Sequence, residues 1–117
     1  MTVGEIARLL DAAWLCCQEE GRREIHAAFA SDMMSDVLAY VKDQAILLTG
    51  LVNPQVIRTA MMMDMHCVVF VRNKKPPAEI VELARDNGIV VLRSACRMYE
   101  ACGRLYASGL GTEESAL

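Results

Sequence analysis

Three short apolar runs place the strongest constraint on how this chain can fold. They occupy residues 45–48, 67–71 and 89–92, are rich in aliphatic side chains, and are each followed by polar residues or glycine. Apolar runs of this length without alternation are typical of strands buried on both faces of a parallel sheet. The segments between them are long enough for the helical crossovers that parallel strands need. The sequence therefore predicts a single three-layer-like α/β domain, with a mostly parallel sheet of about five strands and flanking helices.

Capping and turn residues predict the remaining elements. Thr2 and Glu5 have the spacing of a capping box for a first helix that ends near Asp11. Short strands are expected over 13–17 and 24–30, and helices over about 31–41, 54–63 and 78–87. A last helix is expected after Ser94, which would be its N-cap. We expect the domain to span residues 1–110 and residues 111–117 to form a flexible tail.

Composition limits the classes of function. The 117 residues are 54% hydrophobic and 23% charged, which fits one folded domain with a single core. A net charge of −3 argues against non-specific binding to nucleic acid, because phosphate binding needs a surplus of lysine and arginine. Apolar runs are too short to cross a bilayer, and the first residues lack the pattern of a secretory signal. We therefore expect a cytoplasmic protein that binds neither nucleic acid nor membrane.

The five cysteines fit that location. They form no C-x-x-C pair, and in a reducing compartment they are expected to act as small buried apolar residues, with no disulfide framework, metal or cofactor. A metal site built from Cys96, Cys102 and one histidine is the alternative, although its spacing is unspecific.

Polar residues follow the ends of the predicted parallel strands. Thr49 and Gly50 follow the first run, Arg72 and Lys74 the second, and Ser94 the third. Because the carboxyl ends of parallel strands meet at one edge of a sheet, these residues should gather there. A glycine turn that leads into a helix can hold an anion, and the two cations can bind a carboxylate or phosphate. Neither G-x-x-x-x-G-K-S/T nor G-x-G-x-x-G is present, so no phosphate-binding signature supports a nucleotide.

Four further polar residues have two interpretations. Ser31 or Asp32 can cap the helix that follows, and Ser35 falls in its first turn. Asn53 precedes Pro54 and is a suitable N-cap for the next helix. Alternatively, these residues line a ligand pocket at the strand ends. We include all four in the candidate ligand site, and both interpretations stay open here.

The helix over 54–63 carries more apolar surface than one sheet face needs. Met62 and Met65 lie beyond the stripe formed by Val56, Ala60 and Met63. A methionine-rich core is one explanation, and a homodimer contact is the other. We favour the homodimer because the domain is small.

Four segments resemble a known family. They are residues 30–38, 47–54, 69–72 with the following Pro76, and 84–92. Together they resemble the DRTGG domain, and in particular the stand-alone members found near iron-only hydrogenase genes. The resemblance implies an α/β regulatory or ligand-sensing module, similar to the N-terminal domain of HPr kinase and to the middle domain of some phosphate acetyltransferases. The chain departs from the family name, since many members carry Gly-Asp-Arg at positions 50–52 and Thr-Gly-Gly at positions 71–73.

These observations lead to one main hypothesis. The chain is expected to be a non-catalytic, dimeric regulatory module that binds a small anionic metabolite, a nucleotide or a protein partner at the strand-end edge. The alternative is a small enzyme, either a phosphotransfer protein using Ser31 or Ser35, or a redox protein using Cys96. Neither histidine has a spacing that would make it a base for the serines, whereas Cys96 lies near a helix start between two arginines, which favours a reactive thiol.

Overall fold

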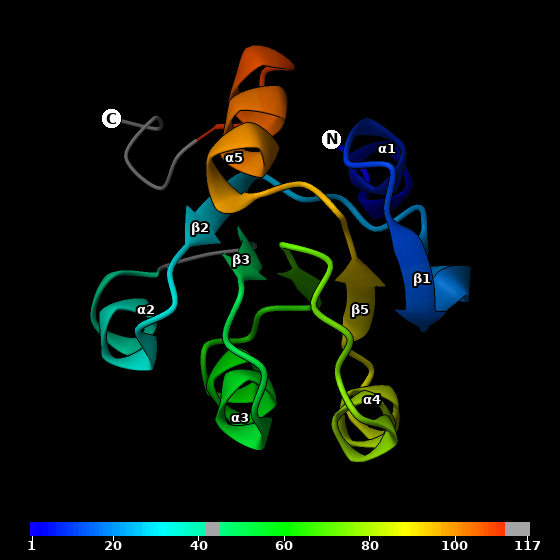
Figure 1. Ribbon diagram of the computed structural model, residues 1–117, viewed down its shortest axis with the longest axis vertical. Helices are drawn as coiled ribbons and strands as arrows, with labels where there is room; N and C mark the ends of the chain where they lie inside the picture. The colour runs from blue at the N-terminus through cyan, green and yellow to red at the C-terminus, as the bar shows by residue number, and fades with distance from the viewer. Residues whose placement is uncertain (42–44, 112–117) are drawn as a thin grey trace.

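The computed structural model describes residues 1–41 and 45–111, which form a five-stranded sheet between two layers of helices (Figure 1). The strands are β1 Ala13–Cys16, β2 Ala27–Ala30, β3 Ala45–Thr49, β4 Cys67–Phe70 and β5 Val90–Arg93. The helices are α1 Val3–Leu9, α2 Met34–Tyr40, α3 Pro54–Met62, α4 Ala78–Asp86 and α5 Met98–Ala107, with a short 3-10 helix η1 at Gln18–Glu20. The predicted fold class is confirmed.

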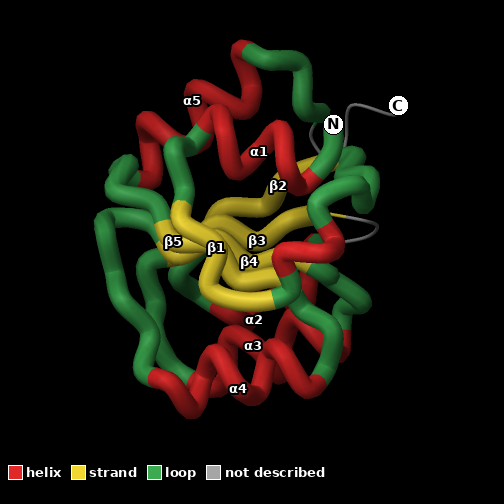
Figure 2. The backbone as a smooth tube through the Cα atoms, turned by 90° about the vertical axis from the view of Figure 1, so that its right-hand side faces the viewer, coloured by secondary structure: helices red, strands yellow, loops and turns green. Residues whose placement is uncertain are grey.

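The sheet has the strand order β1-β5-β4-β3-β2. Strands β2 to β5 are parallel, and β1 pairs antiparallel with β5. From β2 to β5 the chain moves one strand at a time, and the connecting helices α2, α3 and α4 all lie on one face, with α1 and α5 on the other (Figure 2). The strand order therefore never reverses among the parallel strands, so the crevice that such a reversal creates is missing. A site at this edge has to be built by loops and side chains.

Two apolar clusters hold the layers together. Strand β3 is buried at every position, which explains its unbroken apolar run. Along β5, Val91 belongs to the cluster under α2 to α4, whereas Val90 and Leu92 belong to the cluster under α1 and α5. Side chains that alternate between two covered faces must all be apolar, and this is the physical basis of the sequence pattern.

Two predicted helix starts are confirmed. The backbone N–H of Glu5 donates to the Thr2 hydroxyl at 3.1 Å, and the Thr2 N–H donates to the Glu5 carboxylate at 3.2 Å. Asn53 is the N-cap of α3, where its side-chain oxygen accepts from the N–H of Gln55 at 2.9 Å. Pro54 occupies the first turn, as expected.

Two other predicted caps are wrong. The N-cap of α5 is Arg97 and not Ser94, because the chain makes a loop after β5 before the helix begins. The N-cap of α2 is Met33, with no side-chain cap, and neither Ser31 nor Asp32 takes that role. Both residues instead make contacts between loops or within a turn, as described below.

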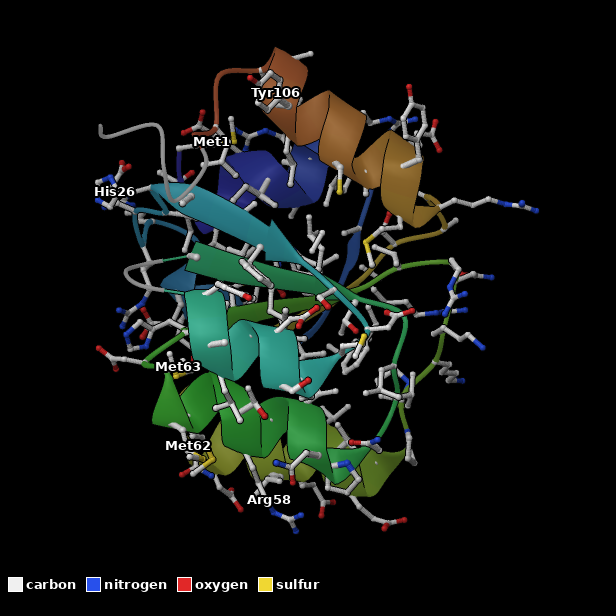
Figure 3. All side chains as sticks on the ribbon, turned by 90° about the vertical axis from the view of Figure 1, so that its left-hand side faces the viewer. Met1, His26, Arg58, Met62, Met63 and Tyr106 are labelled. Atoms are coloured by element: carbon white, nitrogen blue, oxygen red, sulfur yellow. The ribbon has the colours of Figure 1, made fainter. Side chains whose placement is uncertain are left out.

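The prediction for Met65 is also wrong. Its side chain is 1% exposed, because Asp64 turns the chain with a φ of 55° and Met65 returns into the core. Met62 is 71% exposed and lies on the outer side of α3 (Figure 3). Only Met62 of this pair therefore adds to the apolar surface.

Among the described residues, no helix is long and apolar enough to cross a membrane. Of the predicted tail over 111–117, Gly111 forms a parallel bridge with Ala27, and residues 112–117 lie outside the described part of the chain.

Candidate functional site

Four of the predicted site residues meet at the carboxyl ends of β2, β3 and β4. We call Asp32, Thr49, Gly50 and Arg72 the strand-end cluster. One carboxylate oxygen of Asp32, Oδ1, accepts from the Thr49 hydroxyl at 3.0 Å and from the Gly50 N–H at 2.7 Å. The other oxygen, Oδ2, lies 3.7 Å from Nη2 of Arg72. Residues from three separate loops are thus joined at one place by a single carboxylate.

These contacts keep Asp32 ionised. The hydrogen bond from the Gly50 N–H is the largest cause that holds the pKa of Asp32 below its ordinary value. Burial is the second-largest effect and acts in the opposite direction, and the Thr49 hydroxyl and the Arg72 charge lower the pKa further. The Thr49 hydroxyl oxygen also accepts from the N–H of Leu51 at 3.1 Å. The loop between β3 and α3 is therefore fixed by its own hydrogen bonds.

Arg72 lies in an unusual turn. Its φ is 61° and that of Asn73 is 58°, and the N–H of Lys74 donates to the carbonyl of Val71 at 3.3 Å. Two successive left-handed residues at the centre of a turn give type I′ geometry, which glycine adopts without strain and arginine does not. Glycine at both positions would suit this turn. In this chain the same turn carries a guanidinium group instead.

The Arg72 guanidinium lies against Gly50. A β-carbon added at Gly50 would collide with the guanidinium, and Gly50 itself is buried. The sequence predicts that Gly50 lets a bound group approach the backbone closely. In this structure, the group that approaches is a side chain of the same protein.

The turn is anchored to the loop after β5. The N–H of Arg72 donates to the Cys96 carbonyl at 2.7 Å, and the N–H of Asn73 donates to the Ser94 carbonyl at 2.8 Å. Ser94 is 1% exposed, and its hydroxyl donates to the Leu10 carbonyl at 2.7 Å while accepting from the Cys96 N–H at 3.1 Å. The Ser94 side chain therefore links this loop to the end of α1 and is not presented at the surface of the edge.

The other predicted site residues lie outside the strand-end cluster. The Ser31 hydroxyl accepts from the Met33 N–H at 2.9 Å within a local turn, Asn53 caps α3, and Ser35 is exposed in the first turn of α2. Lys74 is exposed beside the Arg72 turn. Within residues 1–41 and 45–111, Lys74 and the adjacent Lys75 form no ion pair.

The geometry gives no support to the enzyme alternatives. His26 directly precedes β2 and Ser31 directly follows it, so the two residues lie at opposite ends of this strand. Within the described chain, the Ser31 hydroxyl bonds only to the backbone of Met33. The Cys96 thiol is buried, at 7% exposure. No group of three metal-ligating side chains is close enough to hold an ion in the part of the chain that the structure describes. Within residues 1–41 and 45–111, no hydrogen bond joins the Ser31 hydroxyl or the Cys96 thiol to a histidine, whereas activation of a nucleophile by a base depends on such a contact.

Sequence reasoning selected all four members of the strand-end cluster but missed how they interact. For Asp32 it leaves open a helix cap and a pocket residue, and nothing in the residue types signals a left-handed arginine. The resemblance stated from the sequence offers one signal, because it implies Gly-Gly at positions 72 and 73, where this chain has Arg72 and Asn73.

Comparisons with known proteins identify the family. The family model of the DRTGG domain matches residues 5–108. The comparison with curated proteins found no match. Among solved structures, the chain is similar to the CBS and DRTGG domains of the regulatory region of Clostridium perfringens pyrophosphatase, complexed with its activator diadenosine tetraphosphate. The TM-score is 0.72 at 16% identity, over 99% of this chain and 52% of that one, so the chain spans about half of that structure's length. The structural likeness supports the fold, and the match of the family model shows that this chain belongs to the DRTGG domain family.

Proposed function

We propose that this domain is a non-catalytic regulatory module that senses a small anionic ligand at the strand-end cluster. Nucleotides are the first class of ligand to test. The observation that carries the proposal is Arg72. A strained backbone conformation is kept at a residue whose side chain is 47% exposed and lies over the ends of the parallel strands. Backbone strain of this kind is concentrated at functional sites, where the surrounding structure maintains it.

The side chains of the edge suit a phosphorylated ligand. A guanidinium can bind two oxygens of one phosphate, and two further exposed cations, Lys74 and Lys75, follow Arg72 closely in the sequence. The Asp32 carboxylate and the Thr49 hydroxyl can bond to hydroxyl groups such as those of a ribose. The regulatory region of the Clostridium perfringens protein is complexed with a dinucleotide activator, which makes nucleotides the first ligands to test.

Three finer proposals accompany this one. We propose that the protein is cytoplasmic and forms a homodimer through the outer side of α3, where Met61 and Met62 are 43% and 71% exposed. The resemblance to stand-alone members found near iron-only hydrogenase genes suggests that a protein partner comes from such a system. A protein partner is the alternative ligand for the same edge.

Thermal-shift and calorimetric titrations test the small-ligand proposal. The ligands are AMP, ATP, diadenosine tetraphosphate and inorganic tripolyphosphate, added to the native chain and to the R72Q and R22Q variants. Arg22 is exposed in the loop before β2 and serves as a matched control, because its loss changes the net charge equally. A ligand at 100 times its Kd stabilises the folded state by about 2.7 kcal/mol. We expect this stabilisation in the native chain and in R22Q and its loss in R72Q. Equal binding by R72Q, or no binding of any of these anions by the native chain, refutes a small-anion site at Arg72.

A further inference from the structure

We propose that Asp32 restrains Arg72 in the ligand-free protein and thereby sets the affinity and charge selectivity of the site. This inference rests on the proposed function and concerns its regulation. The Arg72 guanidinium now covers Gly50, so the protein fills the strand-end cluster with its own cation. A ligand that binds the Arg72 guanidinium therefore has to displace it from Asp32.

The contact between Asp32 and Arg72 is suited to exchange. The two charged groups are 3.7 Å apart, and their side chains are 48% and 47% exposed. Ion pairs this exposed are weak, because water and salt screen both charges. A ligand with several adjacent negative charges can therefore compete for the guanidinium, whereas a ligand with one charge gains little over Asp32.

Asp32 stays in place when Arg72 leaves. The bonds from Thr49 and Gly50 are made to Oδ1, the oxygen that does not face Arg72. The backbone of Arg72 is also held, by its N–H bond to Cys96. The exchange is therefore confined to the long side chain of Arg72, and the remaining carboxylate charge continues to repel anions near it.

The D32N variant distinguishes the effect of the Asp32 charge from the effect of its hydrogen bonds. In D32N the amide oxygen can still accept from Thr49 and Gly50, but nothing holds the guanidinium by charge. Removing a weak exposed ion pair and a nearby repulsive charge should tighten binding of inorganic tripolyphosphate about three- to tenfold. The part of the gain that comes from releasing Arg72 should vanish in the R72Q background, so D32N should strengthen binding less when Arg72 is replaced than in the native chain, as a double-mutant cycle measures. D86N, which removes an exposed carboxylate at the end of α4, should bind like the native chain.

The test is calorimetric titration of tripolyphosphate into the native chain, D32N, R72Q, D32N/R72Q and D86N. The NMR signal of the Arg72 side-chain Nε–H is a second measurement. We expect ligand to shift this signal in the native chain, and D32N to shift it before any ligand is added. If the native chain binds but D32N binds equally or more weakly and leaves the signal unchanged, the restraint is refuted and the proposed site stands. If neither the native chain nor D32N binds tripolyphosphate, the proposed site and the restraint both fail.

Discussion

Replacing Ser94 with alanine should be one of the most destabilising small changes in this domain. The hydroxyl is buried and makes two hydrogen bonds, to the Leu10 carbonyl at 2.7 Å and from the Cys96 N–H at 3.1 Å. Alanine at this position leaves the Cys96 N–H without its side-chain partner and leaves the Leu10 carbonyl with only the weak contact of the Cys96 thiol at 3.8 Å, in a buried site. No cavity larger than one oxygen atom is created, so the effect reports on hydrogen bonding rather than on packing.

The expected magnitude follows from these two contacts. Leaving a buried donor or acceptor without a partner costs about 1–3 kcal/mol. Because two groups are affected but the loop can adjust slightly, we expect the free energy of unfolding to fall by about 2–3 kcal/mol. For a domain of this size, that loss corresponds to a drop in Tm of roughly 10 °C. Typical domains are stable by about 5–15 kcal/mol, so S94A should still fold.

Urea denaturation followed by tryptophan fluorescence measures this change. The only tryptophan, Trp14, is partly buried in β1, the strand that pairs with β5 just before Ser94. The S108A variant makes the same chemical change at an exposed serine and should lose less than about 0.5 kcal/mol. A loss below about 0.5 kcal/mol in S94A, at an unchanged m-value, would show that the hydroxyl does not link the loop to α1 as described.

Four other outcomes follow from the structure. Because folding lowers the pKa of Asp32, its ionised form stabilises the fold at a pH above the ordinary aspartate pKa of about 4. Urea titrations at several pH values should show that the difference in free energy of unfolding between the native chain and D32N shrinks as the pH falls through the folded pKa. Met65→Ala should lower the free energy of unfolding by about 2–5 kcal/mol, because this side chain is buried. Met62→Ala should change the free energy of unfolding little, but light scattering should show a monomer in place of a dimer if the outer side of α3 is the interface. Burial raises the pKa of the Cys67 thiol, so iodoacetamide at about pH 8 should label it only after unfolding, as mass spectrometry can show. Arg72→Gly should relieve backbone strain and change the Tm by only a few degrees, yet it should abolish anion binding in calorimetry.

The sheet could be predicted because burial on two faces leaves a direct trace in the sequence. Every residue of β3 is buried, so all of them have to be apolar or, like Thr49, find an internal partner. Caps were less predictable, because serine and aspartate are chemically suited both to helix starts and to contacts between loops. Asn53 caps α3, but Ser94 bonds to Leu10 across 84 positions of the chain. Such long-range partners depend on the completed fold and have no local signature.

The strand-end cluster shows a different limit of sequence reasoning. The residue types alone mark Arg72 as one of several loop cations, which are usually solvated. The structure distinguishes it from Lys74 because its backbone is left-handed and its side chain lies over Gly50. Glycine at position 72 would form this turn with less strain, so the geometry by itself does not require an arginine. If the arginine side chain had no role, nothing would offset the backbone strain at this position. The proposed site is therefore centred on Arg72 and not on Gly50.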